Sequence, residues 1–157
     1  MIRKRREECV VFLDDCFDTK SSVKILSDAG FQVERFTAHF PDGREVGTRQ
    51  QSVKDPKVIQ LCNAKGYLLV TTDREMRTTF IDELKATEIA ILATANNNEG
   101  DDIWAARIAK EKVRILRGFK NLERPYFNVI QKSGAIRVEI LRMEMTTRRV
   151  RRNERDE

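Results

Sequence analysis

The chain has 157 residues, of which 40% are apolar and 35% are charged. This length and composition are typical of one globular domain with an ordinary core. No apolar run approaches the length of a membrane span, and the basic first residues lead into no signal-peptide segment, so we expect a cytoplasmic protein without a membrane anchor.

The net charge of +5 is concentrated at the two ends of the chain. Residues 3–6 and 148–157 hold nine of the 30 basic and three of the 25 acidic residues, which leaves 21 basic and 22 acidic residues between and beside them. Basic ends on a nearly neutral body favour salt-sensitive contacts with a phosphate backbone, or are simply solvated termini. We expect a single domain over residues 1–145 and a charged, disordered tail over 146–157.

The cysteine and histidine content argues against a zinc site. Cys9, Cys16 and Cys62 are odd in number and lack CxxC spacing, and His39 is the single histidine. A tetrahedral zinc site would need four such ligands close together. We expect the cysteines to be reduced thiols of the core.

Apolar patterns predict a regular alternation of strands and helices. Short β-branched or continuous apolar runs predict strands, and apolar residues at helical spacing predict helices between them. The expected strands lie near residues 9–13, 32–36, 67–71 and 89–93, with an edge strand at 136–141. The expected helices lie between residues 19 and 30, 56 and 65, 76 and 84, and 101 and 119, with a last short helix at 126–130.

This alternation predicts an α/β fold. Right-handed crossovers between successive strands place helices on both faces of a sheet whose strands run parallel. We therefore expect a three-layer α/β/α sandwich with a mainly parallel central sheet of four to five strands.

The segment from Asp55 to Asp73 carries a carboxylate at each end. Pro56 suits the first turn of a helix, and Gly66 suits its carboxyl end. The apolar residues that follow predict a buried parallel strand, which delivers Asp73 at its carboxyl end. Such strand ends are where α/β proteins bind their ligands.

Asp14 follows the first strand as Asp73 follows the third. If those strands are neighbours, Asp14, Asp55 and Asp73 meet at one sheet edge, with Asp15 as a further oxygen donor. Crowded carboxylates repel one another unless a cation compensates, and Mg²⁺ or Mn²⁺ prefers oxygen ligands. Each aspartate taken alone is better explained as a turn or helix cap, whereas two aspartates at strand ends together are better explained as a site.

Two stretches resemble the PIN-like domain family, which includes VapC-type toxins. They are Val-Phe-Leu-Asp-Asp, ending at Asp15, and the segment from Asp55 to Asp73 with its Gly-x-x-x-x-Thr-Thr-Asp end. The family pattern places an acid after the first strand and an acid, a glycine, a threonine and an acid along this second segment. The segment Ala38-His-Phe-Pro-Asp, which precedes Asp55, resembles the loop at this place in a VapC-like subgroup of short PIN-like proteins.

The resemblance implies a metal-dependent ribonuclease with Asp14, Asp55 and Asp73 in its site. It also implies RNA as substrate and an antitoxin protein as a partner, and a homodimer is compatible with it. Family members carry one more acid, for which Glu45 is the candidate here, and Met76 stands where an aromatic residue is usual.

Two other functions remain open. A response-regulator receiver domain also begins with a strand that ends in Asp-Asp, and it would use Asp73 as phosphoacceptor. Receivers, however, need a Lys-Pro pair after the fifth strand, whereas Lys110 and Lys112 fall inside a predicted helix and should lie far from Asp73. The other alternative is a PIN-like module that binds nucleic acid or protein without cleaving.

Overall fold

The structure is a computed structural model that describes residues 8–41, 55–96 and 98–141, and of Asp55 only the backbone. Six strands form one mixed sheet: β1 (Val10–Leu13), β2 (Gln32–Arg35), β3 (Leu68–Thr71), β4 (Ala90–Thr94), β5 (Tyr126–Ile130) and β6 (Ile136–Arg137). The helices are the 3₁₀ turn η2 (Asp15–Phe17), α1 (Lys20–Asp28), α2 (Phe36–His39), α3 (Asp55–Lys65), α4 (Met76–Thr79), α5 (Ile81–Lys85), α6 (Asp101–Lys110) and α7 (Lys112–Asn121).

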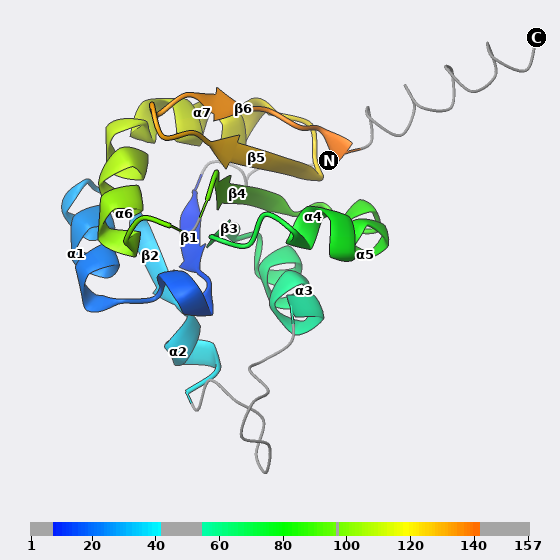
Figure 1. Cartoon of the computed structure of the whole chain (residues 1–157). Helices are drawn as coiled ribbons and strands as arrows, with labels where there is room; N and C mark the ends of the chain where they lie inside the picture. The colour runs from blue at the N-terminus through cyan, green and yellow to red at the C-terminus, as the bar shows by residue number, and fades with distance from the viewer. Residues whose placement is uncertain (1–7, 42–54, 97, 142–157) are drawn as a thin grey trace, which may run out of the picture.

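The strand order is β2-β1-β3-β4-β5-β6. Pairing is parallel from β2 through β5, and β6 runs antiparallel to β5 (Figure 1). The expectation that the first and third strands are neighbours is confirmed, since Val11, Phe12 and Leu13 pair with Leu68, Leu69 and Val70. The order along the sheet reverses between β1 and β3, so the switch point of the topology lies between these two strands.

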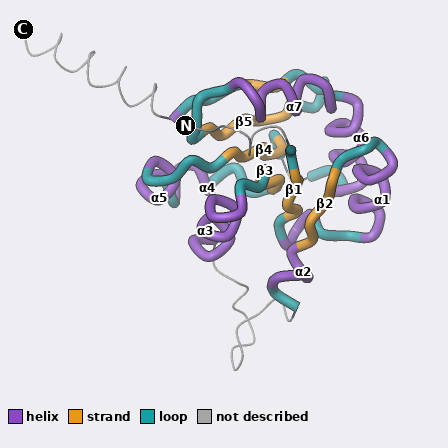
Figure 2. The backbone as a smooth tube through the Cα atoms, turned by 180° about the vertical axis from the view of Figure 1, so that it is seen from behind, coloured by secondary structure: helices purple, strands orange, loops and turns teal. Residues whose placement is uncertain are grey.

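Two apolar core clusters take alternate residues of the strands. One contains Val11 and Leu13 with Leu26 of α1, Trp104 of α6 and Phe119 of α7. The other contains Phe12 and Leu69 with Val58, Ile59 and Cys62 of α3. Because successive residues of a strand point to opposite faces, helices cover both faces of the sheet, as the two views show (Figures 1 and 2).

The segment 126–130 is a strand, and the predicted short helix there is wrong. All five of its residues, Tyr-Phe-Asn-Val-Ile, are buried, and each pairs in register with a residue of β4. Aromatic and β-branched side chains suit a buried strand, and so short an apolar run does not distinguish strand from helix by periodicity. The sheet therefore has six strands instead of four or five.

Two predicted helices are each divided in two. The helix expected over 101–119 breaks at Glu111, where ψ is 19°, and this residue separates α6 from α7. The helix expected over 76–84 breaks at Phe80, where ψ is 31°. The other predicted elements are confirmed within a few residues. Among the described residues, every helix is too short or too polar to cross a lipid bilayer.

Candidate functional site

Asp14 and Asp73 lie at the carboxyl ends of the neighbouring strands β1 and β3. Asp14 is only 7% exposed. Its pKa is raised, chiefly by burial, and the nearby carboxylates of Asp15 and Asp73 add to the rise. Two predicted site residues are thus brought together on either side of the switch point, which is where open α/β sheets bind ligands.

Thr71 connects the two acids. Its buried hydroxyl donates to Oδ2 of Asp14 at 2.7 Å and accepts the backbone N–H of Asp73 at 3.1 Å. Oδ1 of Asp14 accepts the backbone N–H of Asp15 at 2.9 Å. These hydrogen bonds favour the charged carboxylate of Asp14 and partly offset its burial.

The predicted capping roles are also present. Asp14 caps the 3₁₀ turn η2, and Oδ1 of Asp73 accepts the backbone N–H groups of Glu75 at 3.0 Å and Met76 at 3.2 Å at the start of α4. Oδ2 of Asp73 accepts no hydrogen bond from another residue within the described parts of the chain. Capping and ligand binding are therefore compatible for Asp73, because each uses a different oxygen.

The other predicted acids are placed less completely. Asp15 is exposed on η2, directly beside Asp14. Asp55 begins α3, which leads through Gly66 into the start of β3. The carboxyl end of α3 lies next to the amino end of β3, and the helix, about 16 Å long, is slightly longer than this strand. The amino end of the helix, with the backbone of Asp55, therefore lies toward the carboxyl edge of the sheet, as Asp73 does. The Asp55 side chain and the whole of Glu45 lie outside the described residues.

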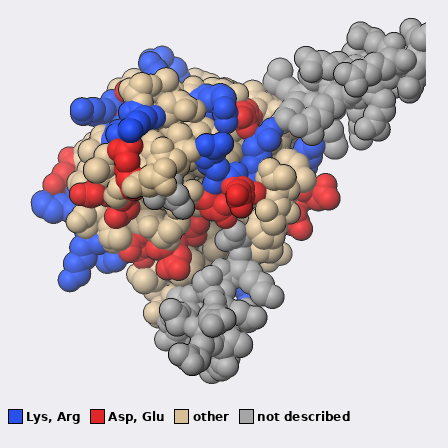
Figure 3. Space-filling view, in the orientation of Figure 1, with Lys and Arg blue, Asp and Glu red and all other residues tan. Residues whose placement is uncertain are grey.

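A cavity of about 720 Å³ opens next to Asp73. Besides Asp73, its wall contains Cys16 from η2, Thr72 and Arg74 from the segment after β3, and Asn96 from the segment after β4. Thr72 donates to the Cys16 sulfur at 2.9 Å, and the Arg74 guanidinium donates to the backbone carbonyl of Ala95. The surface over this region, between β1 and α1 and between β3 and α4, is rich in acidic side chains (Figure 3).

Sequence reasoning missed Cys16 and Asn96 as residues of this cavity. Asn96 follows β4 by two residues, so the rule that led to Asp14 and Asp73 could have found it. Cys16 was expected in the core, but it is exposed. The local sequence Asp-Cys-Phe gives no signal that predicts the 3₁₀ turn, which places the Cys16 thiol at the surface.

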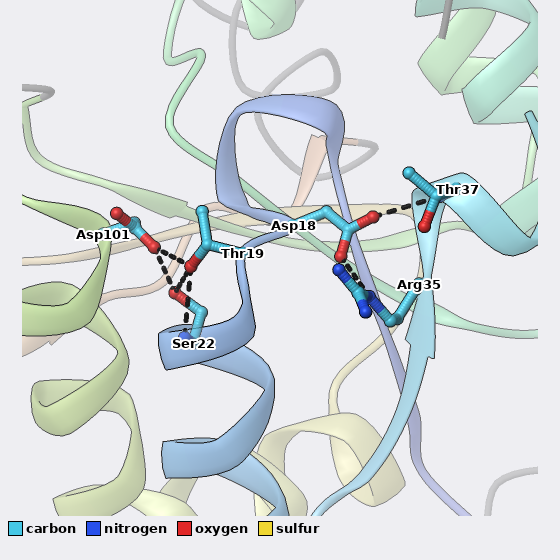
Figure 4. A network of polar contacts seen from close by, with 6 residues as sticks. All are labelled: Asp18, Thr19, Ser22, Arg35, Thr37 and Asp101. Carbon is cyan, nitrogen blue, oxygen red and sulfur yellow. Dashed lines mark hydrogen bonds and ion pairs between the residues drawn. The ribbon is translucent and has the colours of Figure 1, made fainter. Parts of the chain in front are cut away.

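Asp18 has a structural role. Its side chain is 1% exposed, and it accepts hydrogen bonds from Nε of Arg35 at 2.6 Å and from the backbone N–H of Thr37 at 3.0 Å (Figure 4). These bonds join the segment after β1 to β2 and α2. Both oxygens of Asp18 are therefore occupied away from the candidate site.

The lysines of the receiver alternative lie elsewhere, as predicted. Nζ of Lys112 is 5.9 Å from the ring centroid of Phe31, which precedes β2 and therefore lies at the amino edge of the parallel strands. Lys110 is exposed at the end of α6. Asp73 follows the opposite, carboxyl edge, so Lys112 is not positioned to hold a phosphoryl group there.

Comparison with known proteins found no matching family model, no similar curated protein and no similar solved structure. The geometry of the site and the sequence resemblance are thus the basis for a functional proposal.

Proposed function

We propose that the chain is a metal-dependent ribonuclease of the PIN-like type, with the three-layer α/β/α arrangement of that family. The convergence of Asp14 and Asp73 at the switch point carries the proposal. The helices that cover both faces of the parallel strands support the architecture. A toxin function with an antitoxin partner rests on the resemblance alone.

The chemistry of the donors fits a hard divalent ion. Mg²⁺ is commonly bound by one or two carboxylates and keeps several water ligands. Asp14 and Asp73 supply two carboxylates, and Asp55 is the candidate for a further oxygen ligand, whereas the predicted ligand Asp15, which the structure describes, forms no group of three with Asp14 and Asp73. Within the described residues no group of three His, Cys, Asp or Glu side chains is close enough to hold a metal ion, so the third ligand would come from Asp55 or from water.

Each part of the site has a role in phosphodiester hydrolysis. A bound Mg²⁺ or Mn²⁺ would lower the pKa of a coordinated water and stabilise negative charge on a phosphoryl oxygen. Thr71 fixes the orientation of Asp14 through its hydroxyl. Arg74 lines the cavity with no carboxylate partner among the described residues, which leaves its guanidinium available to a substrate phosphate.

The decisive experiment pairs metal binding with RNA cleavage. Purified metal-free protein is heated with and without Mn²⁺, and the same protein is incubated with a fluorescent single-stranded RNA. We expect Mn²⁺ to raise the unfolding midpoint of the wild type by mass action and to permit cleavage. Asp14→Asn and Asp73→Asn should each lose the metal-dependent shift and at least about a hundredfold in cleavage rate, since electrostatic stabilisation of this kind is worth 10²–10³.

The matched control is Asp82→Asn, which removes an exposed carboxylate of α5 away from the cavity. It should behave as the wild type in both measurements. If Asp73 acts only as a cap, Asp73→Asn leaves both unchanged, because Asn caps nearly as well as Asp. A wild type with neither a metal-dependent shift nor metal-dependent cleavage contradicts the proposal. RNA binding without a metal-dependent shift and without cleavage would favour a module that binds RNA and does not cleave it. Acid-labile labelling of Asp73 by acetyl phosphate would favour a receiver domain.

A further inference from the structure

A second cavity, of about 290 Å³, lies between α7 and the sheet. Its apolar wall is formed by Leu68, Leu92, Ile115, Leu122, Tyr126 and Ile136. These side chains come from β3, β4, β5, β6 and the α7 region, and the views agree that α7 runs alongside β5 (Figures 1 and 2). None of the residues that line the cavity beside Asp73 lines this one, so the two sites are separate.

A glycine in the middle of α7 helps to keep this space open. Gly118 lines the cavity, and a methyl group added to it would lie 3.2 Å from Cδ1 of Leu122. Glycine inside a helix is less favourable than alanine. Gly118 is therefore an unfavourable residue for a helix, and its lack of a side chain leaves space at the cavity wall.

Polar groups line the cavity from both sides. Arg117 comes from the helix, is exposed, and forms no ion pair with another described residue. Its neighbour on the wall, Arg114, has only a long contact of 3.5 Å to Glu111. No aspartate or glutamate belongs to the wall, so the polar part of the cavity is cationic.

Asn128 of β5 is the buried polar group on the sheet side, with 6% of its surface exposed. Its Oδ1 accepts the backbone N–H of Glu139 at 3.2 Å, whereas its Nδ2 donates to no other described residue. Because Nδ2 is not enclosed by protein and Asn128 lines the cavity, its N–H groups are available to a ligand oxygen there.

We propose that this cavity binds a small apolar acid, with its hydrocarbon part against the apolar wall and its carboxylate oxygens accepting hydrogen bonds from Arg117 and Asn128. The volume is near the lower limit for small-molecule sites, which suits a medium-chain carboxylate and excludes a lipid with two long chains. The free guanidinium selects an anion over a neutral or cationic amphiphile of the same shape. The proposal is independent of the nuclease function.

The test is a binding titration of the full chain, without metal, followed by the ¹⁵N–¹H NMR shifts of residues 114–138. Octanoate is compared with octylammonium and octanol, which have the same chain and a different head group. We expect octanoate to bind at least about tenfold more tightly than either. Arg117→Glu should weaken octanoate at least about tenfold, whereas Lys20→Glu, the same charge reversal at an exposed position of α1, should not.

Gly118→Ala provides a second, conservative variant. Its methyl group enters the space between Gly118 and Leu122, so octanoate should bind more weakly. Equal binding of the three probes, an unchanged affinity in Arg117→Glu, or no octanoate binding at millimolar concentration would each overturn the proposal. Binding of an acidic, apolar peptide in place of octanoate would also overturn it and identify a protein-docking site instead.

Discussion

Thr71 shows how much one side chain contributes to the candidate site. Its hydroxyl is fully buried and can donate to Asp14 because the same oxygen accepts from the backbone of Asp73. One residue therefore holds the first acid in position and ties the second to it. The Thr-Thr-Asp run was recognised from the sequence as a pattern, and the structure supplies the physical reason for its first threonine.

The three thiols should differ in reactivity according to their exposure. Cys62 is fully buried and desolvation raises its pKa, while desolvation raises the pKa of the half-buried Cys9 to about 12. Desolvation and the neighbouring Asp14 carboxylate also raise the pKa of Cys16, but Cys16 is exposed on the wall of the Asp73 cavity, so access favours its reaction. We expect iodoacetamide to modify Cys16 at least about tenfold faster than Cys9 in the native protein, and Cys62 only after unfolding.

Peptide mass spectrometry of the time course measures these three rates separately. Saturating Mn²⁺ should slow the modification of Cys16 and leave Cys9 unchanged, because Cys16 shares its cavity with Asp73. First labelling at Cys9 would contradict the exposure argument. Equal Cys16 rates with and without Mn²⁺ would count against metal binding in this cavity.

At the scale of elements, Asp101 joins α6 to the start of α1. Its Oδ2 accepts hydrogen bonds from the hydroxyls of Thr19 and Ser22, the latter at 2.6 Å, and the Thr19 side chain also accepts the backbone N–H of Ser22 (Figure 4). Gly100 occupies the cap position of α6, and Asp101 lies in the first turn that follows. Its carboxylate instead connects two neighbouring helices that pack against the same face of the sheet.

This connection makes the stability of the pair dependent on pH. Burial alone raises the pKa of Asp101, but the hydrogen bonds from Ser22 and Thr19 outweigh it and the net pKa lies below the ordinary value of 3.8. A lowered pKa contributes stability above the ordinary pKa, and that contribution is lost as the pH falls through the folded-state pKa. We expect Asp101→Asn to reduce the free energy of unfolding by roughly 0.5–1 kcal/mol at pH 7, because water screens the partly exposed carboxylate and Asn keeps one acceptor oxygen.

The difference between wild type and Asp101→Asn should shrink as the pH falls below 3.8, where urea unfolding can follow it. Asp102→Asn is the control, because Asp102 occupies the same first turn of α6 but is exposed. It should cost only a few tenths of a kcal/mol. A cost for Asp101→Asn that is the same at every pH would show that charge has no part in the connection.

At the scale of the whole molecule, basic charge is unevenly distributed. The two ends carry the excess, and within the body α7 has four basic residues and no acidic one: Lys112, Arg114, Arg117 and Lys120. In the space-filling view, basic side chains gather toward α7 and the β5–β6 turn (Figure 3). Either α7 or the ends could provide phosphate contacts, and the ends lie outside the described residues.

We expect deletion of residues 146–157 to weaken RNA binding and to flatten its salt dependence. The segment holds five arginines, and each phosphate contact with single-stranded RNA contributes about 0.7 to the slope of log K against log salt. The slope should therefore become shallower by roughly 1–3. Fluorescence anisotropy at several salt concentrations measures it.

Replacement of the same five arginines by glutamine keeps the length of the tail and should reproduce the effect of the deletion. An unchanged slope in both variants would mean that the tail makes no phosphate contacts, and charge reversal on α7 would then be the next test. The unfolding midpoint should stay the same throughout.

The sequence by itself determined several of the strands and the residues that follow them. Apolar runs set β1, β3 and β4, and the polar residues directly after β1 and β3 could only emerge at the carboxyl ends of those strands. Local chemistry also set some helix ends: the Thr19 side chain accepts the backbone N–H of Ser22 at the start of α1, and Gly66 has the positive φ of 73° expected at the end of α3.

Tertiary structure decided the rest. That β1 pairs with β3, and so brings Asp73 to Asp14, depends on which strands become neighbours, and no local pattern contains that information. The short apolar run from Tyr126 to Ile130 does not by itself distinguish a strand from a helix. It forms β5 because it pairs with the edge of β4 and is buried there. The apolar cavity under Gly118 likewise exists only because α7 packs over the sheet there, and its residues are far apart in the chain.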